Sequence, residues 1–217
     1  MKNPFDLYAR DYDIWYDKNK FIFLSELKCI KKALNNRNIK DKKSIEIGVG
    51  TGRFARGLNI KYGIDISKNS LKIAKRRRIK VFLSPAEKTP FKDKEFDYVF
   101  IIFSLCFFKN FKKALKESVR ILKKNGNIIV TMINPDSETG KFYNKKKKKD
   151  IFYRNARFYS PRKVIKELEK DNIGNIKTFQ TLFKSPEYLK SHKKVEPTKK
   201  GHNKGGVVVI KGVKYGN

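Results

Sequence analysis

Three glycines and a carboxylate stand close together between residues 46 and 52, where the sequence reads Glu-Ile-Gly-Val-Gly-Thr-Gly. The segment follows a short apolar stretch typical of a strand and precedes a helical turn. Glycine lets a backbone turn tightly and lets a ligand approach where a Cβ would otherwise stand. Asp65 ends the next predicted strand, and a carboxylate there can accept hydrogen bonds from both hydroxyls of a ribose. Together these residues predict a binding site for a nucleoside-containing ligand.

The spacing of the glycines and the acid beside them narrow the choice of ligand. Dinucleotide-binding folds show the pattern G-x-G-x-x-G before a helix whose N-terminus holds a pyrophosphate. Here Gly48, Gly50 and Gly52 alternate with other residues, and Glu46 precedes them. A carboxylate at that place would repel a pyrophosphate and attract a positively charged amino group. S-adenosylmethionine fits this description, because it combines a ribose and an adenine with a cationic sulfonium and an α-amino group, and carries no phosphate.

Strands and helices alternate along the part of the chain that must position these residues. Apolar stretches predict strands at 44–48, 62–66, 81–83, 96–103 and 127–133. Helical periodicity predicts helices at 21–34, 71–77, 111–122 and 160–171. The tail adds two further strands, at 175–183 and 207–213. Ser67 is a suitable N-cap for the second of these helices, and the alternation predicts a parallel, doubly wound sheet.

Five segments, taken in order and with their spacing, resemble the class I S-adenosylmethionine-dependent methyltransferases, notably the group akin to the quinone-biosynthesis C-methyltransferases. They are residues 46–52, 63–67, 85–91, 96–99 and 114–126. The resemblance, from about Tyr8 to Val213, implies an α/β fold with a Rossmann-like, doubly wound sheet of seven mostly parallel strands and an antiparallel C-terminal hairpin. One domain would span 1–217, divided into an N-terminal helical cap (1–40), a cofactor-binding half (41–133), and lid loops with the hairpin (134–217).

The resemblance also implies roles for the residues around the glycine turn. Glu46 and the backbone of Gly48 would hold the methionine amino group, and Asp65 would bind the ribose hydroxyls. Phe103, at the end of the fourth strand, would lie under the sulfonium. The implied cofactor-binding residues are Glu46, Gly48, Gly50, Gly52, Asp65, Ile66, Ala86, Glu87 and Phe103. Pro85 stands where the family often has an Asp that takes the adenine amino group, so that hydrogen bond would need another acceptor.

The methyl acceptor is predicted to enter above the fourth strand, between the aromatic N-terminal segment and two long loops at 134–159 and 184–206. In the family the N-terminal segment commonly covers the cofactor, so the candidate pocket residues are Tyr8, Tyr12 and Tyr16. Methyl transfer is an in-line displacement, and a base is needed only if the acceptor must first lose a proton. Tyr12 and His202 are the candidate catalytic residues. The sequence shows no metal-ligand spacing of His and Cys.

The chain carries 53 Lys and Arg against 21 Asp and Glu, a formal charge of +32. Such a charge is typical of proteins that bind nucleic acid, but Lys outnumbers Arg 42 to 11. An AT-rich coding sequence also favours Lys and Asn codons, so the excess of these residues can reflect base composition, with the side chains exposed to solvent. We therefore predict methyl transfer to a small-molecule acceptor. The alternatives are an RNA (tRNA or rRNA) or protein methyltransferase, and a non-catalytic basic binding module on the same fold.

Cysteine usage and hydropathy bound the setting of the protein. Cys29 and Cys106 are too few for a disulfide framework, which favours a reducing, cytoplasmic location. No apolar run reaches the roughly 18 residues that a membrane helix needs. A monomer or a homodimer is expected.

Several charged or reactive side chains are predicted to be structural. Asp97 is expected to brace the sheet, and Glu117 and Arg120 to pair across one helical turn. Cys106 is expected to be a small buried residue and not a nucleophile. The five lysines at 145–149 are predicted to lie in a solvated loop.

Overall fold

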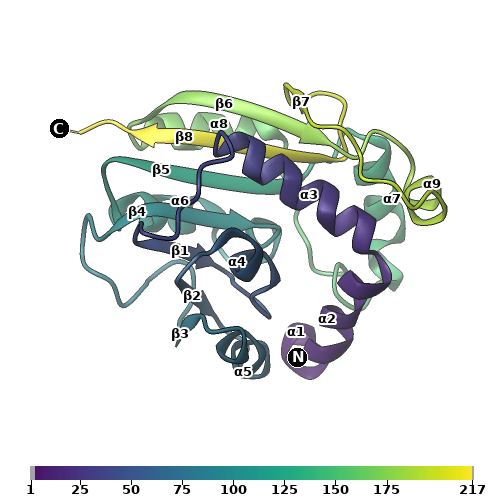
Figure 1. Ribbon diagram of the computed structural model, residues 1–217, viewed down its shortest axis with the longest axis horizontal. Coiled ribbons are helices and arrows are strands. Elements are labelled where there is room, and N and C mark those ends of the chain that lie inside the picture. The colour runs from purple at the N-terminus through teal and green to yellow at the C-terminus, as the bar shows by residue number, and fades with distance from the viewer. Residues whose placement is uncertain (1–2, 217) are drawn as a thin grey trace.

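The computed structural model describes residues 3–216, which form one eight-stranded sheet flanked by helices (Figure 1). The strands are β1 Ser44–Ile47, β2 Tyr62–Asp65, β3 Lys80–Leu83, β4 Phe96–Ile102, β5 Leu122–Ile133, β6 Ile173–Thr181, β7 Lys199–Lys200 and β8 Val207–Lys214. Their order across the sheet is β3-β2-β1-β4-β5-β8-β6-β7. The first five are parallel, whereas β8 is antiparallel to both β5 and β6. The predicted doubly wound sheet with an antiparallel C-terminal hairpin is therefore confirmed.

Helices cover both faces of this sheet. They are α1 Pro4–Leu7, α2 Ala9–Lys18, α3 Lys20–Ala33, α4 Arg53–Leu58, α5 Lys68–Arg76, α6 Phe111–Arg120, α7 Glu138–Lys146, α8 Pro161–Lys170 and α9 Pro186–Ser191, with short 3-10 helices η1 Leu105–Phe107 and η2 Lys147–Lys149. The apolar sides of α6 and α8 pack on one face, and those of α3, α4 and α5 pack on the other. This arrangement gives the sheet two hydrophobic layers, as a parallel sheet requires.

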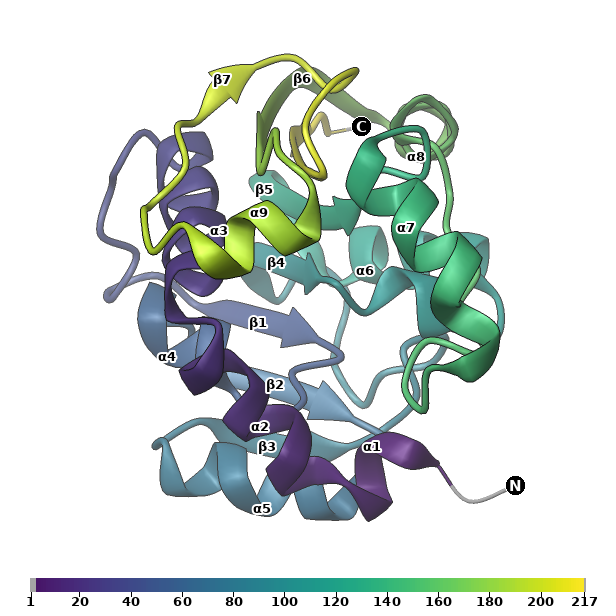
Figure 2. The ribbon, with the colours of Figure 1, turned by 90° about the vertical axis from the view of Figure 1, so that its right-hand side faces the viewer.

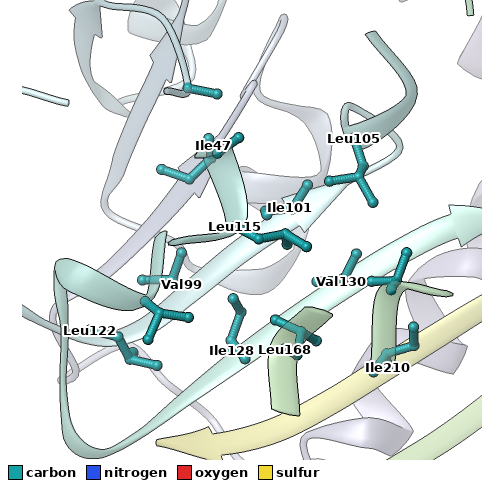
Figure 3. Close-up of a cluster of buried hydrophobic side chains, with 14 of the residues drawn as sticks. Ile47, Val99, Ile101, Leu105, Leu115, Leu122, Ile128, Val130, Leu168 and Ile210 are labelled. Carbon is teal, nitrogen blue, oxygen red and sulfur yellow. The ribbon is translucent and has the colours of Figure 1, made fainter. Parts of the chain in front are cut away.

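Alternation along the central strands divides the core between these two layers. In β4, Val99 and Ile101 belong to the cluster under α6 and α8, whereas Phe100 and Ile102 belong to the cluster under α3 and α4. Figure 3 shows the first cluster, in which Leu115 of α6 and Leu168 of α8 lie over the side chains of β4, β5 and β8. A central strand that is apolar on both faces is thus buried on both faces.

The predicted polar braces hold the strands and helices in register. Asp97 accepts hydrogen bonds from the backbone N–H of Lys43 (2.8 Å) and from Lys123 Nζ (2.9 Å). Glu117 accepts from Arg120 Nε at 2.8 Å, which confirms the predicted pair. Burial opposes ionisation of Glu117, but the bonds from Arg120 and Thr89 hold its pKa at about 2. Ser67 caps α5 as predicted, because its side chain accepts the N–H of Ser70.

The prediction of seven strands and two long loops is wrong in detail. The two-residue strand β7 adds an eighth strand at the edge of β6. The segment 134–159 contains α7 and η2, since Ser137 caps the helix by accepting the N–H of Gly140. The segment 184–206 contains α9, with Ser185 as N-cap and Pro186 in its first turn.

The lysine run at 145–149 is not a loop either. Its first two residues form the last turn of α7, where cations interact favourably with the helix dipole. The other three form η2. Four of the five side chains are exposed, so the predicted solvation holds although the predicted loop does not.

The N-terminal segment begins with two short helices, α1 and α2. Tyr8 is the break between α1 and α2, with φ −115° and ψ 32°. Figure 1 places α1, α2, α7 and α9 beyond the ends of β1 and β4, on the side to which these strands point, and Figure 2, viewed from that side, shows α2 and α9 in front of the sheet. In doubly wound sheets this edge is where ligands bind.

Candidate cofactor and acceptor site

The glycine turn after β1 is fixed by hydrogen bonds to the neighbouring strand. The N–H groups of Gly48 and Val49 donate to the carbonyl of Ile64 at 2.9 and 2.8 Å. Gly48, Gly50 and Gly52 all have positive φ (75°, 51° and 79°), a conformation that favours glycine. A Cβ on Gly48 would lie 2.7 Å from Ser104 Oγ, whereas a Cβ on Gly50 would meet nothing within 4 Å. The turn is thus tightly packed at Gly48 and open at Gly50.

Asp65 stands beside the open part of the turn. One of its carboxylate oxygens accepts the N–H of Gly50 at 2.8 Å, and the other accepts the N–H of Ser67 at 2.9 Å. Burial raises the pKa of Asp65, although these backbone hydrogen bonds oppose the rise. The carboxylate is therefore held between the glycine turn and the start of α5, at the strand end where the sequence places it.

Glu46 is a buried carboxylate with an unmet hydrogen-bonding demand. Its side chain is only 2% exposed, and its Oε2 has no hydrogen-bond partner among the described residues. Burial first, and then the nearby charge of Asp65, raise its pKa well above the usual value. A donor that arrives with a ligand would satisfy this oxygen. The open Gly50, Asp65 and the orphaned oxygen of Glu46 fit a ligand that carries both a ribose and an amino group.

The other residues predicted at this site lie at the same edge of the sheet. Ile66 directly follows Asp65 and is 63% exposed, so its side chain is available for packing against a ligand. Ala86 is buried in the turn after β3. Glu87 accepts the N–H of Asn110 at 2.9 Å, which ties that turn to the start of α6. Phe103 follows β4 with a φ of 56° and lies 5.6 Å from the ring of Phe54.

Two acids of the N-terminal helices fasten them over this edge. Asp6 in α1 accepts hydrogen bonds from Ser67 Oγ and from the N–H of Asn69, both at 2.9 Å. Asp13 in α2 accepts from Thr51 Oγ1 at 2.6 Å, in the glycine turn itself. Ion pairs join Asp13 to Arg53 of α4 (2.9 Å) and to Arg77 at the end of α5 (2.8 Å). Arg77, the central residue of the run Arg76-Arg77-Arg78, therefore pairs with Asp13 within the fold.

Asp13→Asn is expected to lower the free energy of unfolding by about 2 kcal/mol at pH 7. The carboxylate is partly buried, and its bonds from Arg53, Arg77 and Thr51 lower its pKa from 3.8 to about 2, which corresponds to that energy. This contribution is complete above the unfolded pKa and is lost as the pH falls through about 2. Urea unfolding should therefore show a smaller difference from wild type at pH 3 than at pH 7.

The matched control is Asp11→Asn, because Asp11 is an exposed acid on the same helix. It should leave the free energy of unfolding within about 0.5 kcal/mol of wild type. Equal losses in the two variants would mean that Asp13 does not hold α2 in place.

A second polar feature lies under the same helices, in a cavity of about 40 Å³. Its walls carry Trp15, Tyr16, Glu26, Phe103, Tyr143 and Tyr153, together with aliphatic side chains of α3, β5, β8 and α9. We call it the aromatic cavity. Phe103 belongs to its wall, and the adjacent Ser104 packs against Gly48, so the cavity adjoins the glycine turn.

The three N-terminal tyrosines predicted at the acceptor pocket occupy different places. Tyr16 lines the aromatic cavity, and its hydroxyl lies 3.2 Å from that of Tyr12. Burial raises the pKa of both phenols, which favours their protonated forms. Tyr12 also packs on Phe5 and Phe152, with ring centroids 5.1 Å away in each case, and so connects α1 to the segment that follows η2. Tyr8 is 40% exposed at the break between α1 and α2.

Glu26 was not predicted from the sequence, although a signal is present. It lies midway between Ile22 and Ile30, at helical spacing on the buried side of α3. The side chain is 6% exposed, its Oε2 has no hydrogen-bond partner within residues 3–216, and burial raises its pKa to about 8. Thr139 lines the same cavity and has a buried hydroxyl in the same condition.

His202 and Cys106 do not join Glu26 in the aromatic cavity. The Nδ1 of His202 lies 3.3 Å from Thr178 Oγ1 on β6. Burial raises the pKa of the Cys106 thiol to about 12, and its Sγ lies 3.5 Å from the carbonyl of Phe103. Such a thiol stays protonated, as expected for a structural cysteine, although Cys106 is half-buried and not fully buried as predicted.

No helix in residues 3–216 combines the length and the hydrophobicity that crossing a bilayer requires.

Comparison with known proteins identifies the family to which this chain belongs. A methyltransferase-domain profile matches residues 45–130. A S-adenosylmethionine-dependent methyltransferase of Thermotoga maritima, described as a possible histamine N-methyltransferase, has a solved structure that is 38% identical. The match covers 97% of this chain and 98% of that one, with a TM-score of 0.90. An uncharacterized protein of Methanocaldococcus jannaschii is 46% identical over 208 residues, which are 96% of this chain and 97% of the relative.

A more distant relative has a named reaction. The demethylmenaquinone methyltransferase of Thermotoga maritima is 28% identical over 152 residues, which are 64% of this chain and 65% of that enzyme. The similarity to the solved T. maritima structure extends over nearly the whole chain, including the N-terminal helices and the hairpin. The chain therefore belongs to the class I S-adenosylmethionine-dependent methyltransferases, and S-adenosylmethionine is its cofactor.

Proposed function

We propose that this methyltransferase acts on a small molecule, one end of which enters the aromatic cavity. The cavity itself carries the proposal. It adjoins the glycine turn through Phe103 and Ser104, and its volume of about 40 Å³ leaves room for a small group but not for a nucleobase. Its walls are mostly aromatic and aliphatic, as in small-molecule sites.

The residues of the glycine turn would hold the cofactor beside this cavity. Glu46 would accept the methionine amino group, Asp65 would accept the ribose hydroxyls, and Gly50 would leave the space that a side chain would fill. When bound, S-adenosylmethionine supplies a methyl group that is already activated on a sulfonium. The protein's task is then to align the acceptor and exclude water, and the N-terminal helices, tied down through Asp6 and Asp13, suit that task.

The names of the relatives also favour a small acceptor over RNA or protein. One is described as a possible histamine N-methyltransferase and another is a demethylmenaquinone methyltransferase. Lys190, which is exposed on α9, is the one basic residue among the described residues that line the cavity. An RNA site would place many cations along an open groove.

Methyl-labelled S-adenosylmethionine tests the acceptor class. The purified protein is incubated with the low-molecular-mass fraction of a cell extract, with total RNA and with total protein, in separate reactions. Label is expected in the small-molecule fraction, and the labelled compound is then identified by mass spectrometry. Label confined to RNA or protein would contradict the proposed acceptor class. Folded protein that binds S-adenosylhomocysteine but labels nothing would favour a binding module.

A further inference from the structure

The aromatic cavity contains one acidic side chain whose burial the fold does not explain. Glu26 projects from α3 among apolar neighbours, and no described residue gives its Oε2 a hydrogen bond. Tyr16, Tyr143 and Tyr153 line the same cavity as Glu26, and burial is the main cause that raises the pKa of each phenol. Burying a carboxylate without a partner is unfavourable, so this acid points to a ligand that supplies the missing donor.

The walls of the cavity indicate what that donor is. Five aromatic side chains line the cavity in which Glu26 lies, contributed by α2, α7, the residue after β4 and the segment after η2. Aromatic faces attract cations, and amine ligands are commonly held by such rings together with a carboxylate. The other titratable groups that line the cavity are three phenols, which stay neutral, and the exposed ammonium of Lys190 on α9. None of the described residues that line the cavity therefore places a buried positive charge beside Glu26.

We propose that the acceptor is an amine and that Glu26 binds its nitrogen, with the aromatic rings around it. This inference rests on the proposed small-molecule function and specifies the class of acceptor. The buried hydroxyl of Thr139, a wall residue of the same cavity that has no hydrogen-bond partner among the described residues, provides a second contact for the amine. Phe103 lines the same cavity, and its neighbour Ser104 packs on Gly48, so an amine bound in the cavity would lie next to the proposed cofactor turn.

The same contact serves the chemistry of nitrogen methylation. An ammonium ion has no free electron pair, so it must first lose a proton, which the carboxylate of Glu26 accepts. The nitrogen lone pair then forms the new bond to the methyl carbon. The bond between that carbon and sulfur breaks, its electron pair stays on sulfur, and the positive charge passes from the sulfonium to the methylated nitrogen. Burial raises the pKa of Glu26 to about 8, close enough to that of an amine for this proton to move readily.

Calorimetric titration tests the contact directly. Protein saturated with S-adenosylhomocysteine is titrated with methylamine, n-butylamine and benzylamine, and with the matching alcohols methanol, n-butanol and benzyl alcohol. At least one amine is expected to bind, and its alcohol to bind at least tenfold more weakly. Glu26→Gln should weaken amine binding by about 30-fold, as loss of one partner in a buried charged pair does. Glu26→Asp, which keeps the charge, should retain the preference for amine over alcohol.

Two controls distinguish the role of Glu26 from a general effect of the substitution on folding or cofactor binding. Glu187→Gln makes the same change at an exposed residue of α9 and should bind amines as wild type does. Glu26→Gln should bind S-adenosylhomocysteine unchanged and unfold at a temperature no lower than wild type, since it replaces an unpartnered buried acid with a neutral amide of the same shape. Amine binding that is equal in Glu26→Gln and wild type, or no preference for any amine over its alcohol, would overturn the role of Glu26. If small molecules are still labelled then, the proposed function stands and only the amine acceptor is lost.

Discussion

Asp65→Ala is expected to weaken binding of S-adenosylhomocysteine by at least about 100-fold, because hydrogen bonds to a charged group are worth roughly 1.5–3 kcal/mol each and two ribose hydroxyls would lose theirs. In the free protein the carboxylate is already oriented by the N–H groups of Gly50 and Ser67. The cofactor would therefore meet a preorganised acceptor, and little of its binding energy would go into ordering the side chain.

The measurement is calorimetric titration of the wild type and the variant with S-adenosylhomocysteine. Asp65→Asn keeps the shape of the side chain and one acceptor oxygen, so it should lie between the two. Asp41→Ala, at an exposed acid before β1, should bind as wild type does. An Asp65→Ala protein that unfolds normally and keeps its affinity would show that the cofactor lies elsewhere on the sheet edge.

Gly48→Ala is expected to lower the free energy of unfolding by about 3 kcal/mol, of which roughly 1 kcal/mol is backbone strain and the remainder is overpacking. The residue has a φ of 75°, and its new Cβ would lie 2.7 Å from Ser104 Oγ. Ser104 cannot move away freely, because its hydroxyl donates to the carbonyl of Ile47 at 2.7 Å. The added methyl would thus push apart two segments that the core holds together.

Gly50→Ala is the matched comparison, because its φ is also positive but its Cβ would meet no atom within 4 Å. It should lower the free energy of unfolding by only about 1 kcal/mol. Under the proposed function, the same methyl would stand in the space for the cofactor and weaken binding of S-adenosylhomocysteine. Urea unfolding and calorimetry together separate the two effects. Equal stability of the two variants would contradict the packing argument for Gly48.

The parts of the site that could be predicted are those determined by residues close together in the sequence. The turn at 46–52 and the strand-end position of Asp65 follow from local pattern, since glycine spacing and a strand boundary fix them. The parallel, doubly wound sheet was predictable because alternating strands and helices allow few topologies. The cap of α5 at Ser67 was predictable because an N-cap depends only on residues that are close in the sequence.

The acceptor side could not be predicted in this way, because its residues come together only in three dimensions. Glu26 acquires its meaning from Tyr143 and Tyr153, which lie far away in the sequence. In the sequence, Asp13 cannot be told from any other polar residue of an amphipathic helix. Its role depends on ion pairs with Arg53 and Arg77, which only the fold brings close. The helix α7 was missed because its lysine-rich end hides the signal that Ser137 gives at its start.

The position of β8 in the sheet sets the sequence of events during synthesis. β8 follows β6 and β7 along the chain, yet it lies between β5 and β6 and pairs with both. While the ribosome is making the chain, the unpaired edge of β5 therefore waits for a strand that has not emerged, and β6 has no place to dock. The first five strands can assemble in order, but the hairpin joins only in a late, non-local step. Until then the open edge of β5 is the part of the nascent chain most exposed to aggregation.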